Sequence, residues 1–304
     1  MKLKTKNLLT LAELTPKEFL GLIDESIKLK KELKGKGNKS VLKNKTLTMI
    51  FQKPSTRTRV SFEAGMYQLG GHAINLSSDD MQLSRGESIE DTAKTLSRYT
   101  NCIMARVYDH ELLEKLSEHS SVPVINGLSD TFHPCQILAD FMTIKEKKKK
   151  LKGLKIAWIG DGNNVCNSMI YGSALSGVNI SIATPKGFEP NKTVVKEAKK
   201  STTVELTTDP FVAVKNADVI VSDTFSSIHN LDKKRLKKFL PKYQVNSKLM
   251  SAAKKDAIFM HCLPAKRGEE VTSDVIDGVQ SVVWDEAENR LHTQKALLVS
   301  LIHA

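Results

Sequence analysis

Short apolar runs rich in isoleucine and valine alternate with longer amphipathic stretches along most of the 304-residue chain. A short apolar run is typical of a buried strand, and a longer amphipathic stretch is typical of a helix. Their alternation predicts βαβ units, in which parallel strands are joined by crossover helices. The predicted strands are 46–51, 72–76, 101–107 and 122–126 and, after a long helical stretch at 134–150, 155–159, 179–183, 218–221, 257–262 and 281–284.

Two series of strands predict two doubly wound parallel-sheet α/β domains, with the active site in the cleft between them at the carboxyl ends of the strands. A chain of this length is also long enough for two domains. We expect a first domain at 1–133 and a second at 134–285. The last helical stretch, 286–304, either completes the second sheet or crosses back to the first domain.

The chain is basic, with 46 Lys and Arg against 34 Asp and Glu and a net charge of +12. Such a charge attracts nucleic acid or small anionic substrates. The lysine-rich stretches at 28–45, 145–152 and 233–242 are spread along the chain and contain few aromatic residues. This pattern favours a solvated surface, and we expect no nucleic-acid partner.

The four cysteines, Cys102, Cys135, Cys166 and Cys262, have no paired spacing. This argues against a disulfide framework and against a thiolate zinc site, so we expect no metal and a reducing cytoplasm. The first seven residues contain three lysines and no apolar core, and the apolar runs are too short to span a bilayer. We therefore expect neither a secretion signal nor a membrane segment.

The segment 54–59, Pro-Ser-Thr-Arg-Thr-Arg, follows the first predicted strand directly and leads into an amphipathic stretch. Free backbone N–H groups at a helix start, three hydroxyls and two guanidinium groups make a junction rich in donors for an anion. A helix cap with solvated arginines is the simpler structural interpretation. The interleaving of hydroxyls and arginines at the end of a strand favours a phosphate site.

Two further segments place reactive side chains at strand or helix ends. His133 and Gln136 stand at a predicted helix start, where an imidazole can donate to a carbonyl oxygen and an amide can pair with an amide-like NH₂ group. Cys262 follows a predicted strand. Each has an ordinary structural alternative, a core histidine or a buried inert cysteine.

The segment 159–165, Ile-Gly-Asp-Gly-Asn-Asn-Val, also follows a strand and raises the alternative of a dinucleotide-binding turn. Val165 occupies the third glycine position of that motif, and the next strand lacks the acid that holds a ribose. A tight turn that presents Asn163 or Asn164 to a small polar ligand fits better. Asp223, at the end of another strand, is suited to hold an ammonium group or to cap a turn.

In this order, the motifs resemble those of the aspartate and ornithine carbamoyltransferase family over nearly the whole chain. They are STRTR at 55–59, DMQLSRGE at 80–87, HPCQ at 133–136, GDGNN at 160–164, HCLP at 261–264 and AENRLHT at 287–293. The ornithine branch is indicated by Gln82, by Asn163-Asn164 and above all by HCLP. The aspartate branch has a sequence similar to Pro-Leu-Pro-Arg where this chain has HCLP.

The resemblance implies a metal-free, cofactor-free transfer of the carbamoyl group of carbamoyl phosphate to the side-chain amine of ornithine, giving citrulline and phosphate in arginine biosynthesis or degradation. It implies that the last helix returns to the first domain. It also implies a homotrimer, or a multiple of trimers, in which Gln82 reaches the site of a neighbouring subunit.

The resemblance assigns roles to residues of the matching motifs. The phosphate and carbamoyl groups would be held by Ser55, Thr56, Arg57, Thr58, Gln82, Arg106, His133, Gln136, Cys262, Leu263 and Arg290. Ornithine would be held by Asn164, Asp223, Ser227 and Ile228. The catalytic residues would be Arg57, Arg106, His133, Cys262 and Asp223.

Those residue types suit the chemistry. Negative charge grows on the carbonyl oxygen and on the leaving phosphate, so donors aimed at both should supply most of the rate. The attacking amine must be uncharged, and Cys262 and Asp223 are the candidates to receive or steer its proton.

One segment departs from the pattern. Where the ornithine branch usually shows Ser-Met-Gly, this chain has Ser227-Ile228-His229, and the loss of a glycine removes positive-φ freedom. A carbamoyltransferase for another amine, such as putrescine or N-acetylornithine, is therefore the nearest alternative. Alternatives of other classes are a dinucleotide-dependent oxidoreductase and a basic nucleic-acid-binding protein.

Overall fold

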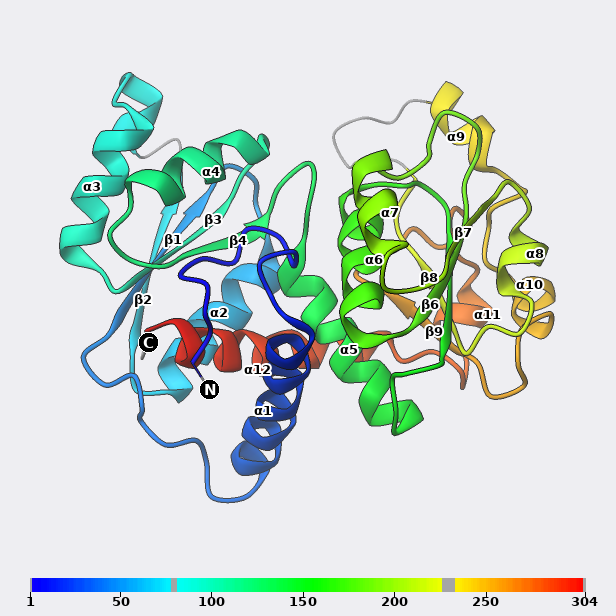
Figure 1. Cartoon of the computed structure of the whole chain (residues 1–304), viewed down its shortest axis with the longest axis horizontal. Coiled ribbons are helices and arrows are strands. Elements are labelled where there is room, and N and C mark those ends of the chain that lie inside the picture. The colour runs from blue at the N-terminus through cyan, green and yellow to red at the C-terminus, as the bar shows by residue number, and fades with distance from the viewer. Residues whose placement is uncertain (1, 78–80, 226–232, 303–304) are drawn as a thin grey trace. The chain divides into compact units, whose positions relative to one another are not determined.

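The computed structural model describes residues 2–77, 81–225 and 233–302 (Figure 1). The chain divides into two compact units, which we call unit 1, Met1–Met142 with Glu288–Ala304, and unit 2, Thr143–Ala287. Each unit contains one parallel sheet, so the predicted class of two parallel-sheet α/β domains is confirmed. Among the described residues, no helix is both long enough and apolar enough to cross a membrane.

Unit 1 is built on a four-stranded parallel sheet of order β2-β1-β3-β4. Its strands are β1 (Thr46–Phe51), β2 (His72–Ser77), β3 (Cys102–Arg106) and β4 (Val124–Leu128). Its helical elements are α1 (Pro16–Lys34), α2 (Thr56–Gln68), the 3₁₀ helix η2 (Gln82–Arg85), α3 (Ile89–Tyr99), α4 (His110–His119), the first part of α5 (Pro134–Lys148) and most of α12 (Val283–Ile302).

Helices cover both faces of this sheet. Figure 1 shows α3 and α4 on one side of it and α2 and α12 on the other. On the α3 and α4 side, Ala93, Ile103 and Leu113 belong to one buried apolar cluster. On the other side, α2 and α12 approach so closely that a Cβ added at Gly65 would lie 3.2 Å from Cγ of Lys295.

The expected boundary after residue 133 and the observed division of the units differ by half a helix. The units divide inside α5, after Met142, because the first half of this helix packs in unit 1. Phe141 makes an edge-to-face contact with Phe19 of α1, with ring centroids 5.3 Å apart. Most of α12, from Glu288 onward, belongs to the same unit.

Unit 2 is built on a five-stranded parallel sheet of order β7-β6-β5-β8-β9. Its strands are β5 (Lys155–Ile159), β6 (Asn179–Ala183), β7 (Val204–Thr207), β8 (Val219–Ser222) and β9 (Ile258–His261). Its helices are α6 (Asn164–Ser176), α7 (Lys192–Ala198), α8 (Pro210–Val214), α9 (Lys233–Phe239), α10 (Ser247–Ser251) and α11 (Ser273–Ile276).

The predicted strand at 281–284 is wrong. Only a single bridge joins Ser281 to Phe259 of β9, and α12 begins two residues later at Val283. The apolar run was therefore a helix start, with Val283 buried in the core and Trp284 65% exposed. A strand that the sequence did not predict, β7, lies at the edge of the sheet, where two of its four residues are exposed.

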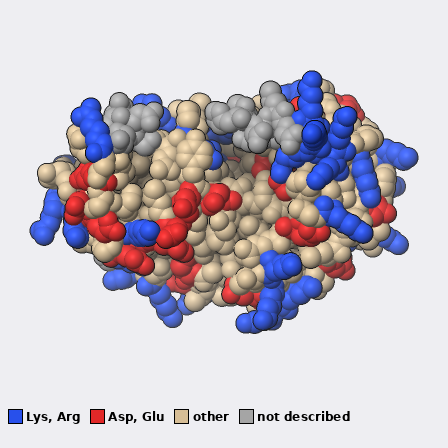
Figure 2. Space-filling model, turned by 90° about the horizontal axis from the view of Figure 1, so that it is seen from above, with Lys and Arg blue, Asp and Glu red and all other residues tan. Residues whose placement is uncertain are grey.

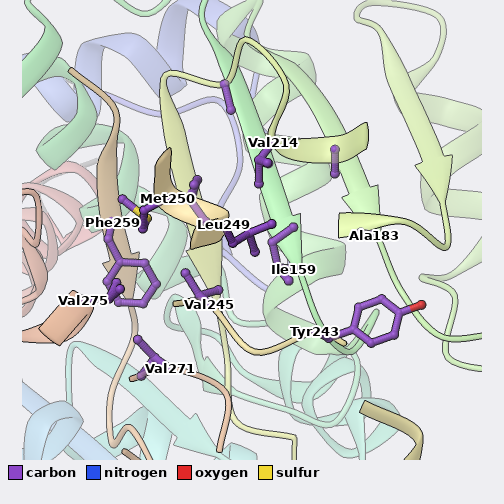
Figure 3. Close-up of a cluster of buried hydrophobic side chains, with 14 of the residues drawn as sticks. Ile159, Ala183, Val214, Tyr243, Val245, Leu249, Met250, Phe259, Val271 and Val275 are labelled. Carbon is purple, nitrogen blue, oxygen red and sulfur yellow. The ribbon is translucent and has the colours of Figure 1, made fainter. Parts of the chain in front are cut away.

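The core of unit 2 lies between its sheet and the short helices α8, α10 and α11. Figure 3 shows Ile159 of β5 and Phe259 of β9 in one cluster with Val214, Leu249 and Val275 from those helices. This packing supports the strands of the sheet, and the candidate functional residues of unit 2 follow their carboxyl ends.

Lysine and arginine side chains do not form one continuous field on the visible face of the molecule. Figure 2 shows them distributed over this face with aspartate and glutamate side chains between them. The lysine-rich helix α9 buries only Phe239. This arrangement fits a solvated surface.

Candidate active site

The first group of functional residues in unit 1 stands where β1 leads into α2. Ser55 caps α2 by accepting a hydrogen bond from the Thr58 N–H, at 3.3 Å. The cap begins the helix at Thr56, leaves Arg57 half-buried on the first turn and buries the side chain of Thr58. Arg106 is the last residue of the adjacent strand β3 and is also half-buried. The sequence therefore places cations at the carboxyl ends of two neighbouring strands.

Helix α12 adds a third arginine to this group. The Arg290 side chain is buried, and its Nη1 donates to Oε1 of Gln136 at 2.6 Å. Its Nη2 lies 3.3 Å from Oγ1 of Thr58. Three residues that are far apart in the sequence, Thr58, Gln136 and Arg290, are thus brought together. We call Arg57, Thr58, Arg106, His133, Gln136 and Arg290 the arginine cluster.

His133 is the titratable member of the arginine cluster whose pKa is displaced. Burial holds the pKa of its imidazole well below the ordinary value, and the charges of Arg290, Arg106 and Arg57 lower it further. The ring is therefore neutral at pH 7, and a neutral imidazole keeps one N–H donor. The same positive charges that keep His133 neutral favour an anion at this place.

Gln82 stands apart from the arginine cluster. It is the first residue of η2, and its side chain is exposed and makes no hydrogen bond with a described residue. An exposed glutamine of this kind is accessible to a second molecule.

Two residues near the arginine cluster were not predicted. Lys53, between β1 and α2, has its Nζ 3.8 Å from the centroid of the Tyr108 ring, and burial and the charge of Arg106 lower its pKa. The signal was a lysine two residues before the STRTR motif. Asp140, on α5, accepts a hydrogen bond from Nε2 of Gln136 at 2.8 Å and is 1% exposed. Its signal was a single acid in an otherwise apolar stretch of helix.

In unit 2, Asp223 lies just beyond β8 and is buried. Cys262, just beyond β9, has its Sγ 3.2 Å from Oδ1 of Asp223. Nδ2 of Asn163 donates to Oδ2 of Asp223 at 2.7 Å, and the Thr224 N–H donates to Oδ1 at 2.7 Å. Three donors thus hold the carboxylate in one orientation. Asn163 makes this contact, whereas Asn164 begins α6.

The backbone that follows Cys262 is held by a buried network. Leu263 has a positive φ of 58°, which costs free energy in a residue with a side chain. Its N–H donates to Nδ1 of His261 at 2.9 Å. Nε2 of His261 lies 3.3 Å from Oε1 of Glu270, and both side chains are fully buried. The tautomer with a proton on Nε2 satisfies both contacts.

Histidine, cysteine, aspartate and glutamate can hold a metal ion when three or more of them lie close together. Within the described part of the chain one such group occurs, Asp223, His261 and Cys262, whose ligand atoms lie within 4.8 Å of one another. In that tautomer of His261, however, the lone pair of Nδ1 accepts the Leu263 N–H, and Nε2 carries the proton that faces Glu270. The histidine therefore has no lone pair to give a cation, and the group fits a hydrogen-bonding role better than a metal site.

Arg235 of α9 links Phe225 to the GDGNN turn. Arg235 of α9 pairs with Asp161 through Nη2 and Oδ2, and its Nε donates to the Phe225 carbonyl at 2.9 Å. Burial raises the pKa of Asp161 to about 6, against the opposing effect of Arg235. The predicted ligands Ser227 and Ile228 lie outside the described residues.

The glycines of the GDGNN turn serve packing and not a dinucleotide. A Cβ added at Gly162 would lie 2.3 Å from the Pro190 nitrogen, so the close approach of two backbones requires glycine. Oδ1 of Asn163 accepts the N–H groups of Val165 and Cys166 at the start of α6. A dinucleotide phosphate would need these N–H groups as donors, but here they already bind the Asn163 side chain.

Comparisons with known proteins also divide the chain into two parts. Residues 6–146 match the family model described as the carbamoyl-P binding domain of aspartate/ornithine carbamoyltransferase, and residues 152–301 match that of its Asp/Orn binding domain. A curated relative from Cenarchaeum symbiosum, named ornithine carbamoyltransferase, is 63% identical over 301 residues, which cover 99% of each chain.

Solved structures of the same name are also similar. The enzyme from Pyrococcus furiosus has a TM-score of 0.95 and 51% identity, with coverage of 98% of this chain and 97% of its own. The enzyme from Thermus thermophilus has a TM-score of 0.91 and 42% identity, with coverage of 98% and 99%. With both family models matched in order and relatives aligned from end to end, the chain belongs to the aspartate/ornithine carbamoyltransferase family.

Proposed function

We propose that the protein transfers the carbamoyl group of carbamoyl phosphate to the side-chain amine of L-ornithine, which gives L-citrulline and phosphate. The observation that carries the proposal is the arginine cluster of unit 1, in which Arg290 contacts Gln136 and Thr58, and burial and the charges of Arg290, Arg106 and Arg57 lower the pKa of His133. Relatives that align over the full length are named ornithine carbamoyltransferase, which supports ornithine as the acceptor.

Unit 1 binds carbamoyl phosphate in this proposal. Arg57, together with Ser55, Thr56 and Thr58 at the start of α2, holds the phosphate, since a guanidinium fork matches two phosphate oxygens. Arg290 closes the phosphate side. These groups neutralise the charge that accumulates as the phosphate leaves, and that charge is larger in the transition state than in the substrate.

The carbamoyl group is recognised by its two ends. Arg106, Thr58 and neutral His133 donate to the carbonyl oxygen, where negative charge develops when the amine attacks. Gln136 accepts from the carbamoyl NH₂ group, and the backbones of Cys262 and Leu263 contribute further acceptors. The positive φ of Leu263 supports this role, because such strain is common where a backbone contacts a ligand.

Unit 2 binds ornithine. Asp223 holds the amino-acid end with Asn164, Ser227 and Ile228, and Asp223 and Cys262 take or steer the proton of the attacking amine. A free alkyl ammonium has a pKa of ~10, so the amine must lose a proton before it attacks the carbonyl carbon. The three donors on Asp223 support this role, because they hold its carboxylate in one orientation.

We further propose that the protein works as a homotrimer, or a multiple of trimers, in the cytoplasm. The exposed Gln82 supports the first part, because a side chain that makes no hydrogen bond to a described residue of its own chain is available to the phosphate of a neighbouring subunit. The free cysteines support a reducing compartment.

The experiment is phosphate release from carbamoyl phosphate by the purified protein with no metal added, tested with ornithine, putrescine, N-acetylornithine and aspartate in parallel. We expect release with ornithine alone. Release with another of the four amines would keep the chemistry but transfer the specificity to that amine. No release with any of them would overturn the proposal.

A further inference from the structure

Asp140 is a buried acid to which neither the motifs nor the transfer chemistry assigns a role. It lies on α5 one turn after Gln136, within a stretch of this helix that is buried throughout. Gln136 and Asp140 are each 1% exposed, and Nε2 of Gln136 lies 2.8 Å from Oδ1 of Asp140. A buried acid is costly unless it is used, so its position against a binding residue needs a reason.

Asp140 and Arg290 together decide which way the Gln136 amide points. An ionised carboxylate only accepts hydrogen bonds, and a guanidinium only donates them. The amide must therefore turn its NH₂ group to Asp140 and its carbonyl oxygen to Arg290, whose Nη1 is 2.6 Å from that oxygen. The opposite orientation would set donor against donor and acceptor against acceptor at the two ends of the same side chain.

The fixed orientation has a consequence for substrate choice. A carbonyl oxygen accepts two hydrogen bonds, so Oε1 of Gln136 can accept from Arg290 and also from an N–H group of the substrate. Carbamoyl phosphate has an NH₂ group where acetyl phosphate has a methyl group of similar size. A site that is built to pair with N–H rejects the analogue that lacks it, because the protein acceptor is then left without a partner.

We propose that Asp140 is a positioning residue that fixes the Gln136 amide with its oxygen toward the substrate, and that it thereby makes the site select carbamoyl phosphate over acetyl phosphate. The inference rests on the proposed function. It concerns a residue that acts through Gln136 and does not itself touch the substrate.

The test compares the KM for carbamoyl phosphate with the Ki for acetyl phosphate as a competitive inhibitor of the same reaction, with ornithine saturating. In Asp140→Leu the NH₂ group of Gln136 loses its acceptor, so the amide is held only through Arg290 and its oxygen is no longer fixed from both ends. We expect the ratio of Ki to KM to fall about tenfold, which corresponds to one hydrogen bond. A purely structural lesion would raise KM and Ki together and leave the ratio unchanged, which would overturn the inference.

A swapped pair provides the rescue. In Gln136→Glu combined with Asp140→Asn, the amide donor and the carboxylate acceptor exchange places with the same number of heavy atoms and the same net charge. The carboxylate introduced on the longer side chain presents an acceptor oxygen in any orientation, so we expect the ratio to return to within about threefold of the wild-type ratio. In Gln136→Glu alone the two carboxylates face each other without a donor between them, so we expect a lower ratio than in the swapped pair. Equal ratios in these two variants would refute the role of Asp140, even if the single Asp140 variant does not fold.

The matched control is Asp218→Leu. Asp218 is a buried acid of unit 2 that accepts from Nζ of Lys254 at 2.6 Å and from the Lys155 N–H at 2.9 Å. We expect this variant to lose stability and to keep the ratio of Ki to KM. Wild-type turnover with carbamoyl phosphate and ornithine tests the proposed function separately, since the ratio is defined only when that turnover is observed.

Discussion

Replacing Arg57 with methionine separates the phosphate-binding role of this residue from any role in the fold. Its half-buried side chain makes no hydrogen bond or ion pair with a described residue, and its charge acts on the nearby imidazole of His133. Methionine keeps a similar length and an apolar stem. We therefore expect the free energy of unfolding to change by less than about 0.5 kcal/mol.

The catalytic cost should be large. A guanidinium gives a phosphate two charge-assisted hydrogen bonds, each of which contributes about 1.5–3 kcal/mol. Loss of both removes about 3–6 kcal/mol, or roughly 10²- to 10⁴-fold in kcat/KM. The assays are phosphate release at varied carbamoyl phosphate and urea unfolding followed by circular dichroism.

The same helix offers a matched control two residues further on. Arg59 is exposed and pairs with Glu63 at 3.3 Å, an i,i+4 surface contact that contributes little. We expect Arg59→Met to stay within about twofold of wild type in kcat/KM, since only a surface contact is lost. Equal losses in the Arg57 and Arg59 variants, or an Arg57→Met enzyme within fivefold of wild type, would refute the assignment of Arg57 to the phosphate.

Three further predictions concern the turn at Gly162, the buried Lys295 and the Asp223–Cys262 pair. Gly162→Ala should cost at least about 2 kcal/mol in urea unfolding, because its Cβ would meet the Pro190 nitrogen at 2.3 Å; wild-type stability would contradict that close approach. Burial lowers the pKa of Lys295 from 10.5 to about 8, so the folded chain binds fewer protons than the unfolded chain between these values. The free energy of unfolding should thus rise with pH across this window, by up to about 3 kcal/mol, and this stability should be lost again as pH falls through about 8. Lys295→Met should abolish the rise, and an unchanged slope of stability against pH in that variant would contradict the prediction. Asp223→Asn should raise the KM for ornithine more than about tenfold. Cys262→Ser keeps a donor to the Asp223 carboxylate and should leave the KM for carbamoyl phosphate within about threefold of wild type. An unchanged KM for ornithine in the first variant, or a large rise in the KM for carbamoyl phosphate in the second, would contradict the proposed roles.

Most strands were predictable because a strand buried in a parallel sheet has a continuous apolar run, and the chain has such runs. The two errors occurred where an apolar run and a buried strand do not coincide. The edge strand β7 has two exposed residues among its four, so its sequence lacks the signal. The run at 281–284 is apolar because it enters the core, yet it continues as α12, and no local period separates those outcomes.

The candidate site was predictable in its residue types but not in its contacts. Motif order identified Gln136 and Arg290, which are 154 positions apart, but nothing local says that they share a hydrogen bond. Asp140 was overlooked because a single acid in an apolar helix is uninformative until its neighbour is known. Similarly, the depressed pKa of His133 depends on burial and on arginines from three different elements.

The most direct test of the central claim follows the carbamoyl carbon itself. Carbamoyl phosphate labelled with ¹³C at that carbon is incubated with the purified protein and L-ornithine, and the products are quantified by NMR and by a phosphate assay. The account predicts labelled L-citrulline and phosphate in equal amounts, and formation of both at least about 100-fold more slowly with Arg57→Met. Phosphate released without labelled citrulline, or citrulline formed equally well by the Arg57→Met protein, would contradict it.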